Sequence, residues 1–100
     1  PGSTSDILAR TVGEHMGKSL GQPIVVENRP GAGGNIAGEA VAKSPADGYT
    51  LLLATISSHG INPSLFAKMP YDAVRDFTPI VALASSPNAL IVGPDVPAGS

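Results

Sequence analysis

Apolar residues recur every four positions near the start of the chain, which predicts one face of a helix. The residues of this apolar stripe are Leu8, Val12, Met16 and Leu20. A parallel stripe contains Gly13 and Gly17, and such small residues favour close packing, here against a sheet. Ser3 and Asp6 have the spacing of an N-terminal capping box, and Gly21 is typical of a helix end. The pattern predicts a helix over residues 4–20.

Further along, short apolar runs alternate with turn residues. Strands are predicted over residues 24–27, 49–55, 80–84 and 89–92, and a second helix over residues 35–43. The run YTLLLAT (49–55) is apolar without alternation in its middle, which is typical of a strand buried on both faces of a parallel sheet. Residues 56–62 are predicted to be a polar loop, followed by a short helix at Pro63. The fold class is therefore α/β, with a layered, mostly parallel sheet and flanking helices.

A glycine cluster in VVENRPGAGGN, residues 25–35, joins a predicted strand to a predicted helix, as phosphate-binding loops do. The dinucleotide fingerprint fails because Ile36 stands where its third glycine is needed, and the P-loop fails because Asn35-Ile36 replaces its Gly-Lys-Ser/Thr. The favoured interpretation is a turn that needs positive φ and close backbone approach, seating the second helix on the sheet.

Composition excludes several classes of function. A net charge of −2 provides no basic field for nucleic acid, and no apolar run is long enough for direct membrane insertion. Without cysteine, disulfides and thiolate metal sites are excluded, and the two histidines have no metal-ligand spacing. We therefore expect no metal and no cofactor.

Two clusters of hydroxyl groups are candidates for binding a small anion. Ser3, Thr4 and Ser5 open the first helix, and Thr55, Ser57 and Ser58 follow the buried strand. Helix N-termini favour anions, and ligands of open α/β sheets sit at the carboxyl ends of the strands. A plain N-cap at Ser3 and a solvated loop at residues 55–58 are the alternatives.

A hydrolytic or transferase enzyme that uses Ser57 or Ser58 with His59 is the competing interpretation. The chain has no G-x-S-x-G elbow, and no carboxylate can be identified as the orienting member of a triad. We therefore expect no catalytic residues and a protein that is not an enzyme.

The whole chain resembles the substrate-binding receptors of tripartite tricarboxylate transporters, also called the Bug family. The resemblance is carried by PGSTSDILAR, GQPIVVENRPGAGGNIAGEAVAKSPADGYTLLLAT, INPSLFAKMPYDAVRDFTPI and NALIVGPDVPA. It implies a periplasmic receptor with two α/β lobes that close on a ligand, as in type II-like binding proteins (a Venus flytrap). Residues 1–84 would belong to the first lobe, and residues 85–100 would lead toward the crossover to a second lobe that this chain lacks.

The resemblance also implies the ligand and the site. The ligand would be a small carboxylate, such as a di- or tricarboxylate, an acidic amino acid or an aromatic acid, delivered to membrane permease subunits. Two segments would hold it, the first loop (residues 2–6) and the second loop (residues 55–59). Their proposed ligand-binding residues are Gly2, Ser3, Thr4, Ser5, Asp6, Thr55, Ser57, Ser58 and His59.

The resemblance finally implies that the chain is an N-terminal part of a longer protein. A signal peptide outside this chain would direct that protein to the periplasm. In isolation, we expect the 100 residues to associate with another chain through an exposed sheet edge.

Overall fold

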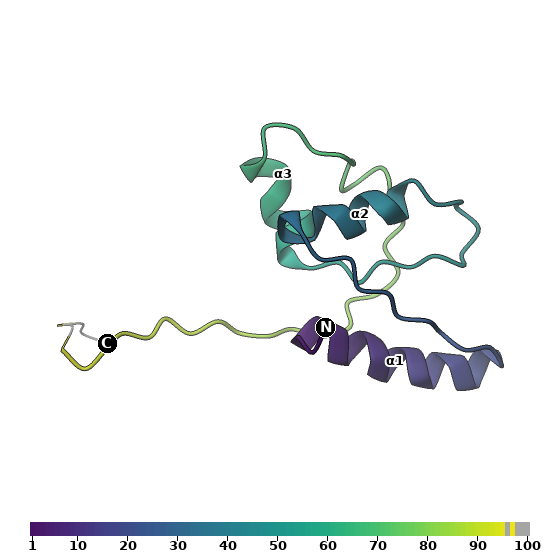
Figure 1. The fold of residues 1–100 in the computed structure, drawn as a ribbon, viewed down its shortest axis with the longest axis horizontal. Coiled ribbons are helices and arrows are strands. Elements are labelled where there is room, and N and C mark those ends of the chain that lie inside the picture. Colours follow the sequence, from purple (N-terminus) through teal and green to yellow (C-terminus); the bar gives the residue numbers. More distant parts are fainter. Residues whose placement is uncertain (96, 98–100) are drawn as a thin grey trace.

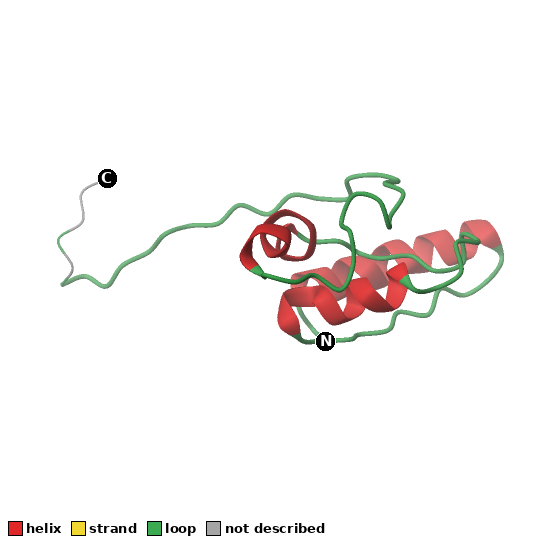
Figure 2. Cartoon of the chain, turned by 90° about the horizontal axis from the view of Figure 1, so that it is seen from above, coloured by secondary structure: helices red, strands yellow, loops and turns green. Residues whose placement is uncertain are grey.

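The structure is a computed structural model that describes residues 1–95 and 97. Along the chain lie α1 (Thr4–Leu20), the 3-10 turn η1 (Ala32–Gly34), α2 (Asn35–Ala42), the π-helix η2 (Ile56–Ile61) and α3 (Asn62–Leu65). Figure 1 shows α1 on one side, with α2 and α3 together on the other. Helices account for all the regular structure of the described residues (Figure 2).

Helix α1 confirms the predicted bounds, Thr4–Leu20. Gly21 adopts the left-handed conformation (φ 71°) that commonly ends a helix. The small-residue face packs on the chain that follows, because a Cβ on Gly13 would lie 3.2 Å from Ile24 Cγ2 and one on Gly17 would lie 3.0 Å from Gln22 O. The prediction of close packing is confirmed, but the partner is an extended segment and not a sheet.

Helix α2 was predicted over residues 35–43 and spans Asn35–Ala42. Its Gly38 lies directly under the Tyr71 ring, since a Cβ there would be 2.5 Å from Tyr71 Cε1. Tyr71 is the one large hydrophobic side chain buried among the described residues. The contact joins α2 to the chain that follows α3.

The four predicted strands are not formed. Residues 24–27, 49–55, 80–84 and 89–92 carry no strand within the described part of the chain, so the parallel sheet is not confirmed. A strand exists through ladder hydrogen bonds to a neighbour, and an extended segment without that neighbour is no strand. The sheet stays a prediction, and of the last predicted segment, 85–100, residues 96 and 98–100 lie outside the described residues.

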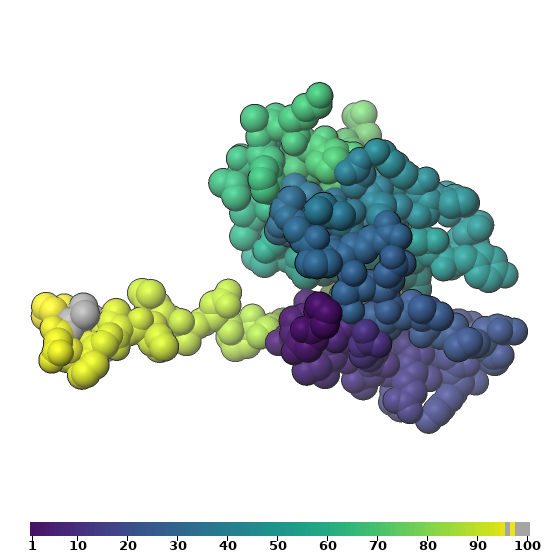
Figure 3. All heavy atoms as spheres, viewed as in Figure 1, coloured from purple at the N-terminus to yellow at the C-terminus, as the bar shows by residue number. Residues whose placement is uncertain are grey.

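Many large apolar side chains are exposed to solvent. The radius of gyration is 16.6 Å, against about 13 Å for a compact domain of this length. The C-terminal segment runs away from the helices as a separate arm (Figures 1 and 3), and its Leu90 is 97% exposed. The described chain therefore consists of local units held by a few specific contacts and not by a common hydrophobic core.

Candidate functional site

The first loop, residues 2–6, is organised by the start of α1. The Ser3 hydroxyl accepts a hydrogen bond from the Asp6 amide at 3.2 Å, so the predicted N-cap is confirmed. The reciprocal half of the predicted capping box is displaced by one residue, because Asp6 Oδ2 accepts from the amide of Gly2 (2.8 Å) and not from that of Ser3. Within residues 1–95 and 97, no partner is recorded for the amides of Thr4 and Ser5.

Asp6 is buried, and its carboxylate is occupied by protein donors. Besides Gly2, its oxygens accept from Arg10 Nε and from Asn28 Nδ2, both at 3.1 Å. The Gly2 amide, the Asn28 side chain and the Arg10 charge hold the pKa of Asp6 below its ordinary value. Asp6 is therefore an ionised acceptor that shapes the first loop, and its charge would repel an anion rather than bind it.

Residues 56–62, which include most of the second loop (residues 55–59), were predicted to be a polar loop, and this prediction is wrong because they are helical. The π-helix η2 runs directly into α3. Thr55 and Ser58 form a capping box, in which the Ser58 amide donates to Thr55 Oγ1 at 3.4 Å and the Thr55 amide donates to Ser58 Oγ at 3.1 Å. The polar residues that indicated a loop are the residues that start this helix.

A buried polar cluster under the second loop was missed from the sequence. The Tyr71 hydroxyl donates to Ser58 O at 2.7 Å and lies 3.1 Å from Asn35 Oδ1. Asn62 Nδ2 donates to Asn35 Oδ1 at 2.8 Å and to Gly33 O at 3.0 Å. Burial raises the pKa of Tyr71, so its hydroxyl stays protonated and can donate at neutral pH.

The glycine cluster is a backbone turn, as the sequence predicted. Gly31, Gly33 and Gly34 all have positive φ, at 125°, 63° and 95°. Neighbouring side chains also leave little room for a side chain at Gly33 and Gly34. A Cβ on Gly33 would lie 3.0 Å from Asn62 Nδ2, and one on Gly34 would lie 3.4 Å from Ser58 Cβ. The turn seats α2 against η2 and α3, and not against a sheet as predicted.

His59 lies among aromatic rings. Its ring centroid is 4.8 Å from that of Phe77 and 5.9 Å from that of Tyr71. Ser58 Oγ lies 2.9 Å from His59 Nδ1, which is the pair that the enzyme interpretation requires. Within the described residues no carboxylate is hydrogen-bonded to His59, and Ser58 is 4% exposed. A serine nucleophile is therefore not favoured by this geometry.

The two loops do not bond directly to each other within the described residues. The first loop borders a groove of about 610 Å³ between α1 and α2, which Val25, Tyr49 and Leu51 also line. The second loop lies against the glycine turn instead. No hydrogen bond or ion pair joins residues 2–6 to residues 55–59 among those the structure describes.

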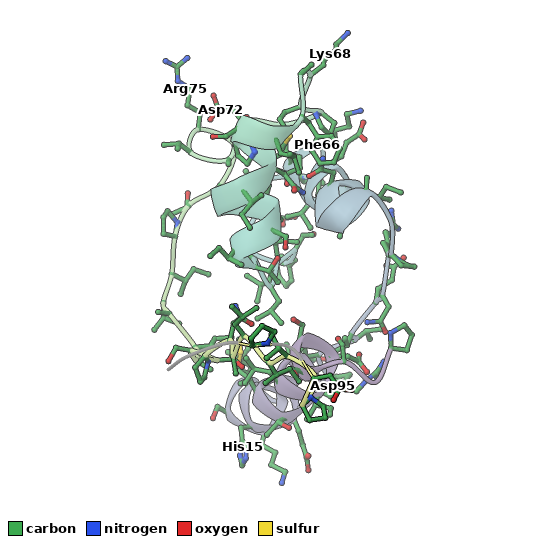
Figure 4. The ribbon with its side chains drawn as sticks, turned by 90° about the vertical axis from the view of Figure 1, so that its left-hand side faces the viewer. His15, Phe66, Lys68, Asp72, Arg75 and Asp95 are labelled. Atoms are coloured by element: carbon green, nitrogen blue, oxygen red, sulfur yellow. The ribbon has the colours of Figure 1, made fainter. Side chains whose placement is uncertain are left out.

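No group of three or more His, Asp or Glu side chains in the described part of the chain could hold a metal ion. His15 is exposed and points outward from α1, away from Lys68, Asp72 and Arg75 (Figure 4). No helix of the described residues has the length and apolarity needed to cross a membrane.

The chain is similar in sequence to several known proteins. Residues 8–100 match the model of the tripartite tricarboxylate transporter family receptor. A UPF0065 protein of Bordetella bronchiseptica is 45% identical over 92 residues, covering 92% of this chain and 28% of that protein. Protein BugT of Bordetella pertussis is 43% identical over 95 residues, covering 94% of this chain and 29% of BugT.

A third relative, the UPF0065 protein in the tcbD-tcbE intergenic region of a Pseudomonas species, is 41% identical over 97 residues, with 95% and 28% of the two chains covered. The chain thus spans less than a third of the length of the curated relatives it matches. No solved structure matches it.

Proposed function

Because the chain belongs to the tripartite tricarboxylate transporter receptor family, we propose that it is part of an extracytoplasmic receptor that binds a small carboxylate and delivers it to the membrane subunits of a transporter. The family match over residues 8–100 carries this proposal. The proposal assigns the protein a binding role and no catalysis. It places the receptor in the periplasm, with residues 1–84 in one α/β lobe and residues 85–100 leading toward a second.

The proposed site consists of the first and second loops. Both loops open helical segments, α1 and η2, where amide N–H groups and the helix dipole favour an anion. The direct donors would be the groups with fewest protein partners, the amides of Thr4 and Ser5 and the hydroxyl of Ser57. Ser3, Asp6, Thr55 and Ser58 would hold these donors in place, since their own polar atoms are bonded within each loop.

Gly2 and His59, the other residues of the proposed site, have supporting roles. Gly2 has a φ of 74° and turns the chain into α1, while its amide fixes Asp6. His59 would bound the second loop on its aromatic side. Hydrogen bonds to a charged acceptor contribute roughly 1.5–3 kcal/mol each, so the three direct donors would supply about 4.5–9 kcal/mol. Micromolar affinity needs about 8 kcal/mol after the entropic cost of binding, so the second lobe would have to add further contacts. Closure of the two lobes would then exclude water from the carboxylate.

Isothermal titration calorimetry of the intact protein tests this function. A panel of mono-, di- and tricarboxylates, amino acids and aromatic acids is titrated, and at least one carboxylate is expected to bind. Ser57→Ala should weaken that binding about tenfold, the equivalent of one hydrogen bond of roughly 1.4 kcal/mol. Ser86→Ala is the matched control, because Ser86 is exposed in the extended C-terminal segment. The absence of binding by every carboxylate contradicts the proposal.

A further inference from the structure

The stretch from Asn28 to Asn35 contacts both proposed loops. At its first end, Asn28 Nδ2 donates to Asp6 Oδ1 at 3.1 Å, and Asn28 Oδ1 accepts from Arg10 Nη2 at 3.2 Å. Asp6 accepts the Gly2 amide with its other oxygen. The Asn28 amide is thus used at both its nitrogen and its oxygen, and it contacts the first loop directly at Asp6.

At the other end of the stretch, Asn35 is 5% exposed and is connected to the second loop through Tyr71. Its Oδ1 accepts from Asn62 Nδ2 and lies 3.1 Å from the Tyr71 hydroxyl. That hydroxyl donates to Ser58 O, the backbone carbonyl at the centre of the second loop. Asn35 is therefore separated from the second loop by one side chain, that of Tyr71.

The backbone between these two asparagines has little freedom. Pro30 has a fixed φ, and the Gly34 amide donates to Gly31 O at 3.0 Å to close the turn. Gly34 lies against Ser58, and the Gly33 carbonyl accepts from Asn62. These contacts hold residues 31–35 against the second loop, and Asn28 holds the other end of the segment to the first loop.

We propose that residues 28–35 form a brace that sets the spacing of the two ligand loops without touching the ligand. The brace rests on the proposed function and adds Asn28, Asn35 and Tyr71 to it as positioning residues. Its benefit is preorganisation, because loops that are already ordered lose less conformational entropy when a ligand binds. This role also accounts for a glycine-rich turn that resembles a phosphate loop but fails its motifs.

Two substitutions cut the brace at opposite ends. Asn28→Ala removes the connection to Asp6 and Arg10, and Tyr71→Phe removes one hydroxyl while keeping the ring over Gly38. Lys43→Ala is the control, because Lys43 is exposed, pairs with Glu39 and does not line the groove at the first loop. The variants are made in the intact protein, and calorimetry measures the dissociation constant of the carboxylate found in the panel.

We expect each cut to weaken binding about tenfold and the double variant to be little worse than either single one, since the spacing is already lost after the first cut. Lys43→Ala should bind like the wild type. Unchanged dissociation constants in both single variants would overturn the brace, even if the melting temperature falls. A double variant that binds about a hundredfold more weakly than the wild type would also overturn it, because the two single effects would then multiply as they do for independent sites.

Amide hydrogen exchange tests the brace without any ligand, so its failure can be told apart from failure of the proposed function. Asn28→Ala should speed exchange at the second loop, residues 55–59, although Asn28 contacts only the first loop. Tyr71→Phe should speed exchange at residues 4–6. Changes confined to the nearer loop in both variants would show that the two loops are held independently, and the brace would be wrong.

Discussion

Asp6 makes the first loop sensitive to acid. Its pKa is lowered in the folded protein, so the folded state binds a proton less readily than the unfolded state, where the pKa is about 3.9. The stability it contributes is therefore present above about pH 4 and is lost as pH falls through the lower folded pKa. Between pH 7 and pH 3, we expect the melting temperature of the intact wild type to fall further than that of Asp6→Asn.

Scanning calorimetry across this pH range measures the difference. Asp72 also has a lowered pKa, because the amides of Arg75 and Val74 donate to its carboxylate. Both proteins contain Asp72, so its effect on the melting temperature cancels when the two are compared. Parallel acid profiles for the wild type and Asp6→Asn would refute the role of Asp6.

Gly38 tests the packing under Tyr71. A Cβ at this position would lie 2.5 Å from Tyr71 Cε1, and the ring is held by its hydroxyl bond to Ser58 O. Gly38→Ala gains about 1 kcal/mol of helix propensity, while overpacking of this buried contact costs about 2–3 kcal/mol, so we expect a net loss of about 1–2 kcal/mol in the free energy of unfolding. Urea denaturation of the intact protein measures it. Gly93→Ala, with no atom within 4 Å of its Cβ, is the control, and equal stabilities would contradict the contact.

Whether a contact between two residues could be predicted from the sequence depended on how far apart the two residues lie along the chain. The N-cap Ser3 acts on Asp6 three positions away, and a short motif contains that information. The Asn35–Asn62 and Asn35–Tyr71 contacts join residues 27 and 36 positions apart. No local pattern marks such partners, so the polar cluster became visible only in three dimensions.

At the scale of elements, η2 depends on its capping box. Thr55→Ala removes the hydroxyl that accepts from the Ser58 amide, which typically costs about 1 kcal/mol. Thr55→Ser keeps the hydroxyl and should retain most of this stability. Denaturation of both variants, together with titration of the carboxylate, measures the effect. We expect the alanine variant to be less stable and to bind more weakly, and identical behaviour of the two variants would contradict the capping role.

Helices were predicted well and strands were not, for a physical reason. The bounds of α1 follow from local signals: apolar spacing, a cap and a terminating glycine. Those of α2 follow from its apolar spacing and from the glycine turn before it. A strand is completed by a neighbour elsewhere in the chain, so the apolar runs at 24–27 and 49–55 could indicate only extended backbone. The second loop was misassigned because Thr, Ser and Asn favour both loops and helix starts.

At the scale of the whole molecule, the 100 residues expose 8037 Å². A compact protein of 10.0 kDa exposes roughly 5200 Å². Exposed apolar residues such as Val25, Ile80 and Ile91 contribute to the excess. We therefore expect the isolated 100 residues to self-associate or to remain expanded, as measured by sedimentation velocity, and a stable compact monomer would contradict this expectation.

The central claim is that a carboxylate is held by the two helix-opening loops and not by the conspicuous glycine turn. The most direct test is amide NMR of the intact protein during titration with the carboxylate that calorimetry identifies. We predict the largest chemical-shift changes at Thr4, Ser5 and Ser57, with smaller changes at residues 31–34. The largest changes at Gly31, Gly33 and Gly34, with Thr4, Ser5 and Ser57 unmoved, would contradict the account.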